Sequence, residues 1–142
     1  MISKNIKGKI YIESISSDSD GTNKIVQTEE CTIFEKSGEI FIFYDESEDT
    51  LASDVKSKIK ISDDSVNIVR KGTYHSNILF KEGYTCNFRY CMPYGDIDMS
   101  VKTDIVKVVN DEKNINISLE YMLNNGEADI KSTMNIKIEK VI

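Results

Sequence analysis

The stretch Phe88-Arg-Tyr-Cys-Met-Pro-Tyr-Gly-Asp-Ile-Asp-Met-Ser-Val-Lys-Thr103 decides the fold. Its second half begins a row of alternating apolar and polar residues, which is typical of an antiparallel strand with one buried face. The buried row predicted there is Ile97, Met99, Val101, Thr103 and Ile105. Pro93, the only proline of the chain, has no N–H for a β-ladder, and Gly95 can adopt positive φ at little cost. The stretch therefore predicts a strand, a tight corner and a second strand.

The same alternation continues in both directions from this stretch. Turn signals such as Asp20-Gly21, Ser37-Gly38 and Asn125-Gly126 separate the segments, and no long window shows apolar residues at helical spacing. The predicted strands are 6–12, 24–36, 39–45, 55–61, 66–70, 74–81, 84–91, 97–105, 115–123 and 130–138.

The spacing of these segments predicts an all-β fold. Every connection is short, so neighbours in sequence can pair with one another. Closure of the sheet would also remove exposed strand edges. We therefore expect a single meandering antiparallel β-barrel of about 8–10 strands rather than a Greek-key sandwich. The 142 residues suffice for a single domain, 1–142, with a real core.

The charge of the chain disfavours two classes of partner. With 18 basic and 24 acidic residues the formal net charge is −6, which opposes non-specific binding of nucleic acid or of an anionic membrane surface. Residues 1–12 contain no apolar run, so we expect neither a signal peptide nor a membrane span.

Three cysteines and one histidine limit the redox and metal chemistry. Cys31, Cys86 and Cys91 form an odd set without CxxC spacing, which favours reduced thiols and a cytoplasmic location. His75 alone cannot provide a histidine-rich metal site. We expect no bound metal and no cofactor.

From about Ile10 to Ile138 the chain resembles the YwiB-like family of bacterial proteins, a domain family of unknown function. The landmarks of this resemblance are Phe43-Tyr-Asp-Glu46, Arg70-Lys-Gly72, Phe80 with Gly83, Tyr90 through Gly95 to Thr103, Leu119-Glu-Tyr121 and Asn135-Ile-Lys-Ile138. Pro93 and Tyr94 precede the glycine at a corner where relatives vary. The resemblance implies a calycin/lipocalin-like barrel of eight or more strands around an interior, and it transfers no catalytic residues.

Arg70 has the parity of Val66 and Ile68, so a regular strand would direct it into the barrel. One interpretation is a guanidinium that binds the carboxylate or phosphate of a ligand. The alternatives are a structural arginine bonded to backbone or to Glu29, or one turned outward by a bulge at Gly72. An inward arginine needs a partner in either case.

Tyr90, Thr103 and Tyr121 each end an otherwise apolar row. Polar groups in such places would lie near a barrel mouth and, together with Arg70, could orient a ligand in a mostly apolar pocket. The alternative is that the tyrosines bury their rings and keep their hydroxyls in water.

Catalytic interpretations are weaker. Cys31 and His75 lack the glycine-rich elbow and third residue of a nucleophilic triad. The carboxylate pairs Glu29-Glu30 and Asp96/Asp98 do not form a convincing acid–base pair, and the acidic loop that begins at Asp45 lacks calcium-loop spacing.

Two functions of different classes remain. The first is a non-catalytic barrel that binds a small apolar or anionic ligand. The second is a solid-cored barrel with a structural or protein-interaction function. The volume left inside the barrel distinguishes them, because small barrels are either filled by side chains or hold one ligand. An enzyme of undefined class ranks third.

Overall fold

The computed structural model describes residues 4–46 and 55–141, and ten antiparallel strands join there into one sheet. The strands are β1 (Lys4–Asp18), β2 (Gly21–Lys36), β3 (Glu39–Asp45), β4 (Lys56–Ile61), β5 (Ser65–Lys71), β6 (Ser76–Lys81), β7 (Thr85–Met92), β8 (Gly95–Asn110), β9 (Asn114–Asn124) and β10 (Asp129–Val141). The all-β prediction is confirmed, and each predicted segment lies within or overlaps one strand. No described helix could span a membrane.

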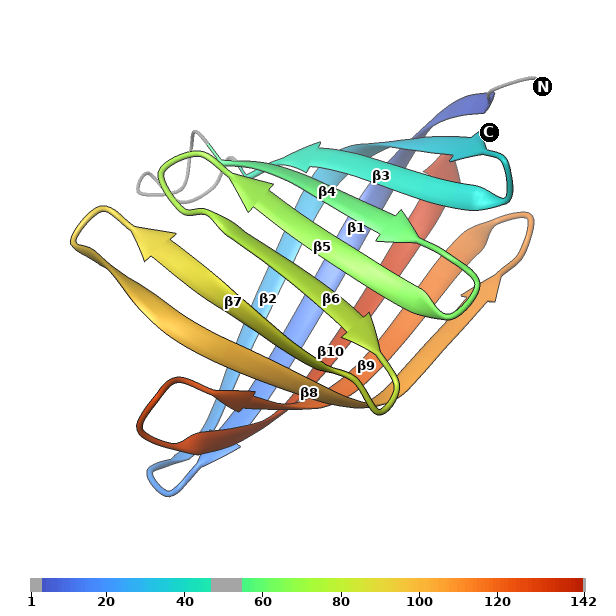
Figure 1. The fold of residues 1–142 in the computed structure, drawn as a ribbon. Helices are drawn as coiled ribbons and strands as arrows, with labels where there is room; N and C mark the ends of the chain where they lie inside the picture. The colour runs from blue at the N-terminus through green and yellow to red at the C-terminus, as the bar shows by residue number, and fades with distance from the viewer. Residues whose placement is uncertain (1–3, 47–54, 142) are drawn as a thin grey trace.

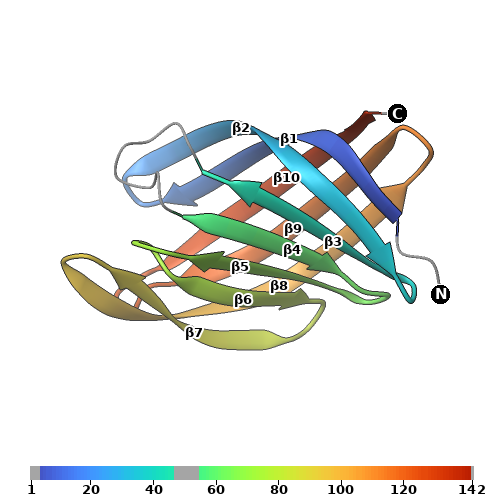
Figure 2. The same cartoon turned by 90° about the horizontal axis from the view of Figure 1, so that it is seen from above.

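The strands curve into a nearly closed barrel (Figures 1 and 2). Their order is β6-β5-β4-β3-β2-β1-β10-β9-β8-β7, so most neighbours in the sheet are also neighbours in sequence. The exception is the ladder between β1 and β10, which runs from Lys7 opposite Val141 to Ser17 opposite Lys131. This ladder joins the two halves of the meander.

The barrel closes between β6 and β7, the two ends of the strand order, without a continuous ladder. At one end of this seam, His75 and Cys91 exchange two backbone hydrogen bonds of 3.0 and 2.9 Å. At the other end the β6–β7 turn docks on β8, where Gly83 N donates to Thr103 O at 2.9 Å and Thr103 N donates to Tyr84 O at 3.2 Å. The seam is therefore held at its two ends.

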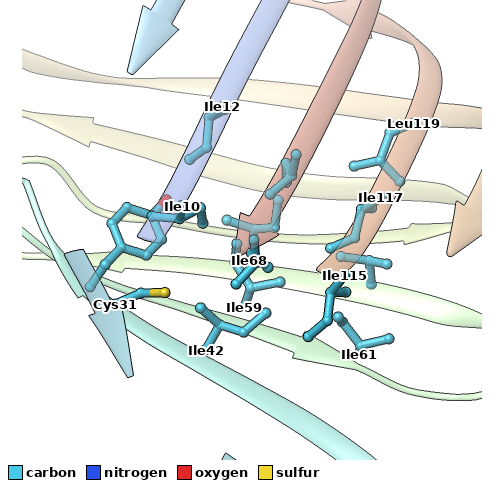
Figure 3. Close-up of a cluster of buried hydrophobic side chains, with 14 of the residues drawn as sticks. Ile10, Ile12, Cys31, Ile42, Ile59, Ile61, Ile68, Ile115, Ile117 and Leu119 are labelled. Carbon is cyan, nitrogen blue, oxygen red and sulfur yellow. The ribbon is translucent and has the colours of Figure 1, made fainter. Parts of the chain in front are cut away.

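Isoleucine dominates the core inside the barrel (Figure 3). This core contains side chains from opposite walls, for example Ile10 of β1, Ile68 of β5 and Ile115 of β9. Burying each such side chain contributes about 1.5–3 kcal/mol. The fully buried aliphatic and aromatic residues include Ile10, Ile33, Ile42, Ile59, Phe80, Ile115, Ile117, Leu119, Ile136 and Ile138. A large part of the interior is thus filled by side chains.

The regular alternation predicted for β8 stops at a β-bulge between Thr103 and Ile105. After it, Val106 and Val108 pack against the core, whereas Ile105 is 40 % exposed. The prediction that Ile105 belongs to the buried row is wrong, because one extra residue in the bulge reverses the parity of the strand. Glu82 Oε2 accepts a hydrogen bond from Val106 N at 2.9 Å, so the β6–β7 turn supports the bulge.

The predicted corner is the turn of the β7–β8 hairpin. Met92 pairs with Gly95, and Pro93 and Tyr94 form the loop between them. Gly95 has a φ of 141°, as its place after Pro93 predicts. Ile97, two residues farther along the hairpin, is 36 % exposed rather than buried, because this end of the hairpin lies near the turn and not over the core.

Candidate functional site

The interior changes from apolar to polar at the level of Arg70. The neighbouring strands β3, β4, β5 and β6 place Tyr44, Ser57, Arg70 and Ser76 opposite one another in turn. At the next inward-facing position of each strand, two residues farther from this end of the barrel, the same strands place Ile42, Ile59, Ile68 and Ile78 in a matching row. On these four strands a polar row therefore lies above an apolar row, near the end of the barrel where β3, β5 and β7 end.

Arg70 forms an ion pair with Glu46, the residue that follows β3. The Nη2 and Nε atoms of Arg70 donate to Glu46 Oε2 at 2.7 and 3.2 Å. Glu46 is 8 % exposed, and its backbone N–H donates to Val55 O at 3.0 Å, which fixes its position. Burial acts to lower the pKa of Arg70, but the hydrogen bond and charge of Glu46 raise this pKa above its usual value. The guanidinium is consequently charged.

Two tyrosines complete the environment of Arg70. Its Nη1 donates to Tyr90 Oη at 3.4 Å, and its Cζ lies 5.9 Å from the centre of the Tyr74 ring. The two tyrosine rings also contact each other, with centroids 6.2 Å apart. An aromatic face favours a nearby cation, so the Tyr74 ring contributes to holding the guanidinium.

Gln27 links two buried carboxylates. Its Nε2 donates to Glu46 Oε1 at 3.2 Å and, more weakly, to Glu29 Oε2 at 3.4 Å. Glu29 is 7 % exposed and points inward from β2. We refer to Gln27, Glu29, Glu46, Arg70 and Tyr90 as the mouth cluster.

All members of the mouth cluster except Tyr90 border an open pocket of about 460 Å³, which we call the mouth pocket. Gln27, Glu29, Glu46 and Arg70 line it together with Tyr44. The rest of its wall is Ile12, Ser14, Ile25, Val26, Ile68, Met134 and Ile136. This volume lies within the range of small-molecule sites, which combine apolar walls with a few convergent polar groups.

A larger hollow elsewhere in the surface is less suited to a ligand. A hollow of about 860 Å³ near the chain ends is larger, but its wall includes Asn110, Asp111 and Glu112, which are exposed to solvent. Unlike the mouth pocket, it does not continue into the core of the barrel.

The structure divides the four predicted ligand-binding residues into two pairs. Arg70 points inward at the mouth and lies beside Tyr90. Thr103 and Tyr121 are opposite each other on β8 and β9 and lie outside the mouth pocket. Thr103 is fully buried beside the β6–β7 turn, and the Tyr121 ring packs on Phe80 with centroids 5.0 Å apart.

Glu46 and Gln27 are functional candidates that the sequence reasoning missed. Glu46 belongs to the predicted acidic loop that begins at Asp45, yet it continues the inward row of Ile40, Ile42 and Tyr44 by one step. That parity is a signal which could have identified it. Glu29, the partner considered for Arg70, is in the cluster, and the ion-pair partner is Glu46.

The thiol and imidazole considered for catalysis do not form a site. Cys31 is buried, and burial raises its pKa to about 11, so the thiol is protonated at neutral pH. His75 is exposed and uses its backbone to pair with Cys91 at the seam. Within residues 4–46 and 55–141, no three His, Cys, Asp or Glu side chains converge as a metal site.

Comparisons with known proteins agree with this architecture. A family model described as a domain of unknown function (DUF1934) matches residues 10–138. The chain is 24 % identical over 119 residues to the uncharacterized beta-barrel protein YwiB of Bacillus subtilis (strain 168), covering 83 % of this chain and 82 % of that protein. The crystal structure of the ywiB protein from Bacillus subtilis superposes with a TM-score of 0.87 at 23 % identity, covering 99 % and 96 % of the two chains.

Proposed function

Because the chain belongs to the DUF1934 family, whose description assigns no activity, we propose its function from the mouth pocket: non-catalytic binding of a small, partly apolar molecule. The single observation that supports this proposal is the change in the interior at the level of Arg70. Below it the barrel is packed with aliphatic side chains, and above it a pocket of about 460 Å³ is left open. Polar groups from four strands, together with Glu46 just after β3, line that pocket.

Different parts of the pocket wall offer apolar and polar contacts to a ligand. Ile12, Met134 and Ile136 offer apolar contact from β1 and β10, and Ile25 extends this surface to the rim, where it is 59 % exposed. The mouth cluster supplies the polar groups that would orient the ligand. Its side chains hold one another through hydrogen bonds, so the site is organised before the ligand arrives.

We test the proposal by filling the pocket. Ser14→Phe adds a large side chain to its wall, and Ser17→Phe makes the same change at an outward-facing position of the same strand. The native protein is first examined by native mass spectrometry for a co-purifying molecule. It is then titrated by ¹⁵N NMR with a panel of small acids, amines and neutral molecules.

We expect at least one molecule to shift the amide signals of residues 27, 29, 46 and 70 in the native protein and in Ser17→Phe. The same molecule is expected to leave these signals unchanged in Ser14→Phe. The proposal would be contradicted if no molecule of the panel binds, or if a molecule binds Ser14→Phe as well as it binds the native protein. Either result would favour the solid-cored alternative.

One observation favours that alternative as the second candidate. Ile25 and Val26, adjacent on β2, are 59 % and 64 % exposed, and exposed apolar side chains are available for contact with another protein. If they contact another protein, Val26→Lys will abolish an association seen by analytical ultracentrifugation.

We also propose a cytoplasmic location. It is supported by three cysteines that are unpaired in the structure, two of them buried among core residues. Titration with a thiol reagent in denaturant without reductant is expected to find three thiols, and recovery of one would reveal a disulfide and contradict this location.

A further inference from the structure

The tip of the β7–β8 hairpin extends as an arm at the mouth of the barrel (Figure 1). On one side of this arm, the pairing of β8 with β9 begins only at Ser100, opposite Asn124. On the other side, no continuous ladder joins β7 to β6. Among the described strands, residues 88–99 therefore pair only with each other, and we call this two-stranded ribbon the flap.

The flap is held together by its own contacts. Residues 88–92 pair without interruption with residues 95–99. Across the ribbon, Arg89 Nε also donates to Asp98 Oδ1 at 3.0 Å. Because the ribbon is internally paired and gains β9 as a second neighbour only at Ser100, we expect it to move as one piece about that point.

The flap is tied to the opposite side of the seam by two kinds of contact among the described residues. Cys91 and His75 exchange backbone hydrogen bonds of 2.9 and 3.0 Å, and this is an isolated pair rather than part of a ladder. The Tyr90 hydroxyl accepts a hydrogen bond from Arg70 Nη1 at 3.4 Å, which is long for a bond of this type. The Tyr90 ring also lies 6.2 Å from that of Tyr74, centroid to centroid. We refer to these contacts together as the latch.

The other end of the seam is fastened more firmly. There the chain itself joins β6 to β7, and Gly83 and Tyr84 form backbone hydrogen bonds of 2.9 and 3.2 Å with Thr103. Glu82 Oε2 also accepts from Val106 N at 2.9 Å. Parts of a protein with few buried apolar contacts and exposed backbone hydrogen bonds open before the rest. The latch is therefore the end of the seam that should open first.

The inward face of the flap lies beside the mouth rather than over the core. Ile97 has the parity of the buried Val101, yet it is 36 % exposed. Phe88, at the base of the flap, is only partly buried against the core. Through Tyr90 the flap contacts Arg70, which lines the mouth pocket. Any movement of the flap consequently changes the surroundings of that pocket.

On the basis of the binding function proposed above, we propose that the flap is a gate at the mouth of the barrel. In the closed state, which the structure shows, the latch holds β7 against β6. In the open state the flap turns about the point where β8 meets β9, and the latch contacts are broken. The rest of the sheet stays paired, and the entrance to the mouth pocket becomes wider.

Amide hydrogen exchange tests this gate in the full chain without any ligand. The two ends of the seam carry backbone hydrogen bonds of similar length, so one end is the control for the other. The amides of His75 and Cys91 report on the latch, and those of Gly83 and Thr103 report on the fastened end. After correction for the intrinsic rate of each residue, the latch amides are expected to exchange at least about tenfold faster.

NMR relaxation dispersion distinguishes a moving flap from the fraying of one isolated pair. If the flap moves as one piece, the amides of residues 88–99 are expected to share a single opening rate. Fraying would affect His75 and Cys91 and leave most of residues 88–99 without an exchange contribution.

Matched variants assign the latch to Tyr90. Tyr90→Ala removes its side-chain contacts, and Tyr94→Ala makes the same change at the 80 % exposed tip of the flap. Tyr90→Ala is expected to speed exchange of the latch amides about tenfold, because it removes an aromatic contact and a hydrogen bond. The amides of the fastened end are expected to stay unchanged, and Tyr94→Ala is expected to affect neither end. If Tyr90→Ala does not fold, as checked by circular dichroism, Tyr90→Phe is expected to give a smaller change of the same pattern.

Three results would overturn the inference: equal protection of the two ends, no common rate for residues 88–99, or a Tyr90 variant that alters both ends alike. None of these measurements uses a ligand, so the gate can fail while binding in the mouth pocket is retained. If the flap opens as expected but no molecule of the panel binds, the proposed function fails, and the assignment of the flap as a gate fails with it.

Discussion

At the residue scale, Arg70 and Glu46 form the ion pair on which the polar end of the barrel depends. The Arg70 side chain is 26 % exposed and that of Glu46 is 10 % exposed, so water screens this pair only in part. Removing one partner of a buried pair is strongly destabilising, because the other charge is left without compensation. The cost here is reduced by the remaining exposure and by Gln27, which also donates to Glu46.

We therefore expect Arg70→Met to lower the free energy of unfolding by about 2 kcal/mol. Adding Glu46→Gln is expected to recover part of that loss, with a coupling energy of about 1–2 kcal/mol between the two positions. Urea denaturation of the native protein, both single variants and the double variant measures this coupling. The control is the exposed pair Arg89–Asp98 at 3.0 Å, where we expect a coupling below about 1 kcal/mol. Additive changes at Arg70 and Glu46 would contradict the prediction.

Gly8 is required for close packing rather than for an unusual backbone angle. A Cβ atom at this position would lie 2.8 Å from the backbone oxygen of Glu139 and 2.9 Å from Ile33 Cδ1. The first neighbour is main chain in a paired strand and cannot move aside cheaply. Sequence parity places Gly8 in the inward row of β1, but only the fold shows how close its neighbours are.

Gly8→Ala is accordingly expected to destabilise the protein by about 1–3 kcal/mol, in the range of overpacked cores. The denaturation midpoint should fall for Gly8→Ala and stay nearly constant for Asn5→Ala, at an exposed position of the same strand. Equal midpoints for the two variants would show that β1 and β10 separate easily, against the close packing described.

At the element scale, the strands were predictable where the information is local. The ten segments are visible in the sequence because alternation and turn residues require only near neighbours. The buried face of β8 after Thr103 was not predictable, because the bulge is supported by Glu82 and by the β6–β7 turn, which lie about 20 residues away. For the same reason parity identified Arg70 as inward. Its partner Glu46 lies at the end of a strand, where the alternation predicts an inward side chain but the acidic composition predicts a loop.

The β7–β8 turn yields a prediction for Gly95. Its φ of 141° lies in a region that a β-branched side chain strongly disfavours, and no atom crowds a Cβ there. Gly95→Val should lower the free energy of unfolding by about 1–3 kcal/mol through backbone strain alone. Thermal or urea denaturation measures it, with Tyr94→Val at the neighbouring 80 % exposed position as the control. A midpoint equal to that of the control would contradict the prediction.

At the scale of the whole molecule, buried acids predict sensitivity to alkali. Burial raises the pKa of Cys31 from its ordinary value of 9.0 to about 11, and those of Tyr44 and Tyr121 from 10.0 to about 12. In the unfolded chain these groups lose their protons at lower pH than in the folded one. Their contribution to stability is therefore complete below pH 9 and is lost as the pH rises toward 11 and 12.

Urea midpoints measured at intervals from pH 8 to pH 11 should fall steadily above pH 9. Cys31→Ala is expected to be less stable throughout, because it leaves a cavity, but to show a shallower decline between pH 9 and pH 11. An unchanged slope in Cys31→Ala would mean that the Cys31 thiol does not contribute to the alkaline transition.

The β1–β10 ladder has a consequence for how the nascent chain acquires its shape. Lys7 pairs with Val141, so this ladder joins segments separated by almost the full sequence, and the entropy of closing so long a loop opposes it. Successive hairpins can form as they leave the ribosome, yet β1 keeps an unpaired edge until β10 has been synthesised. High contact order of this kind slows folding and prolongs exposure of an edge that can pair with other chains. Fusing the C-terminus to the N-terminus and opening the β6–β7 turn would turn this last contact into a local hairpin.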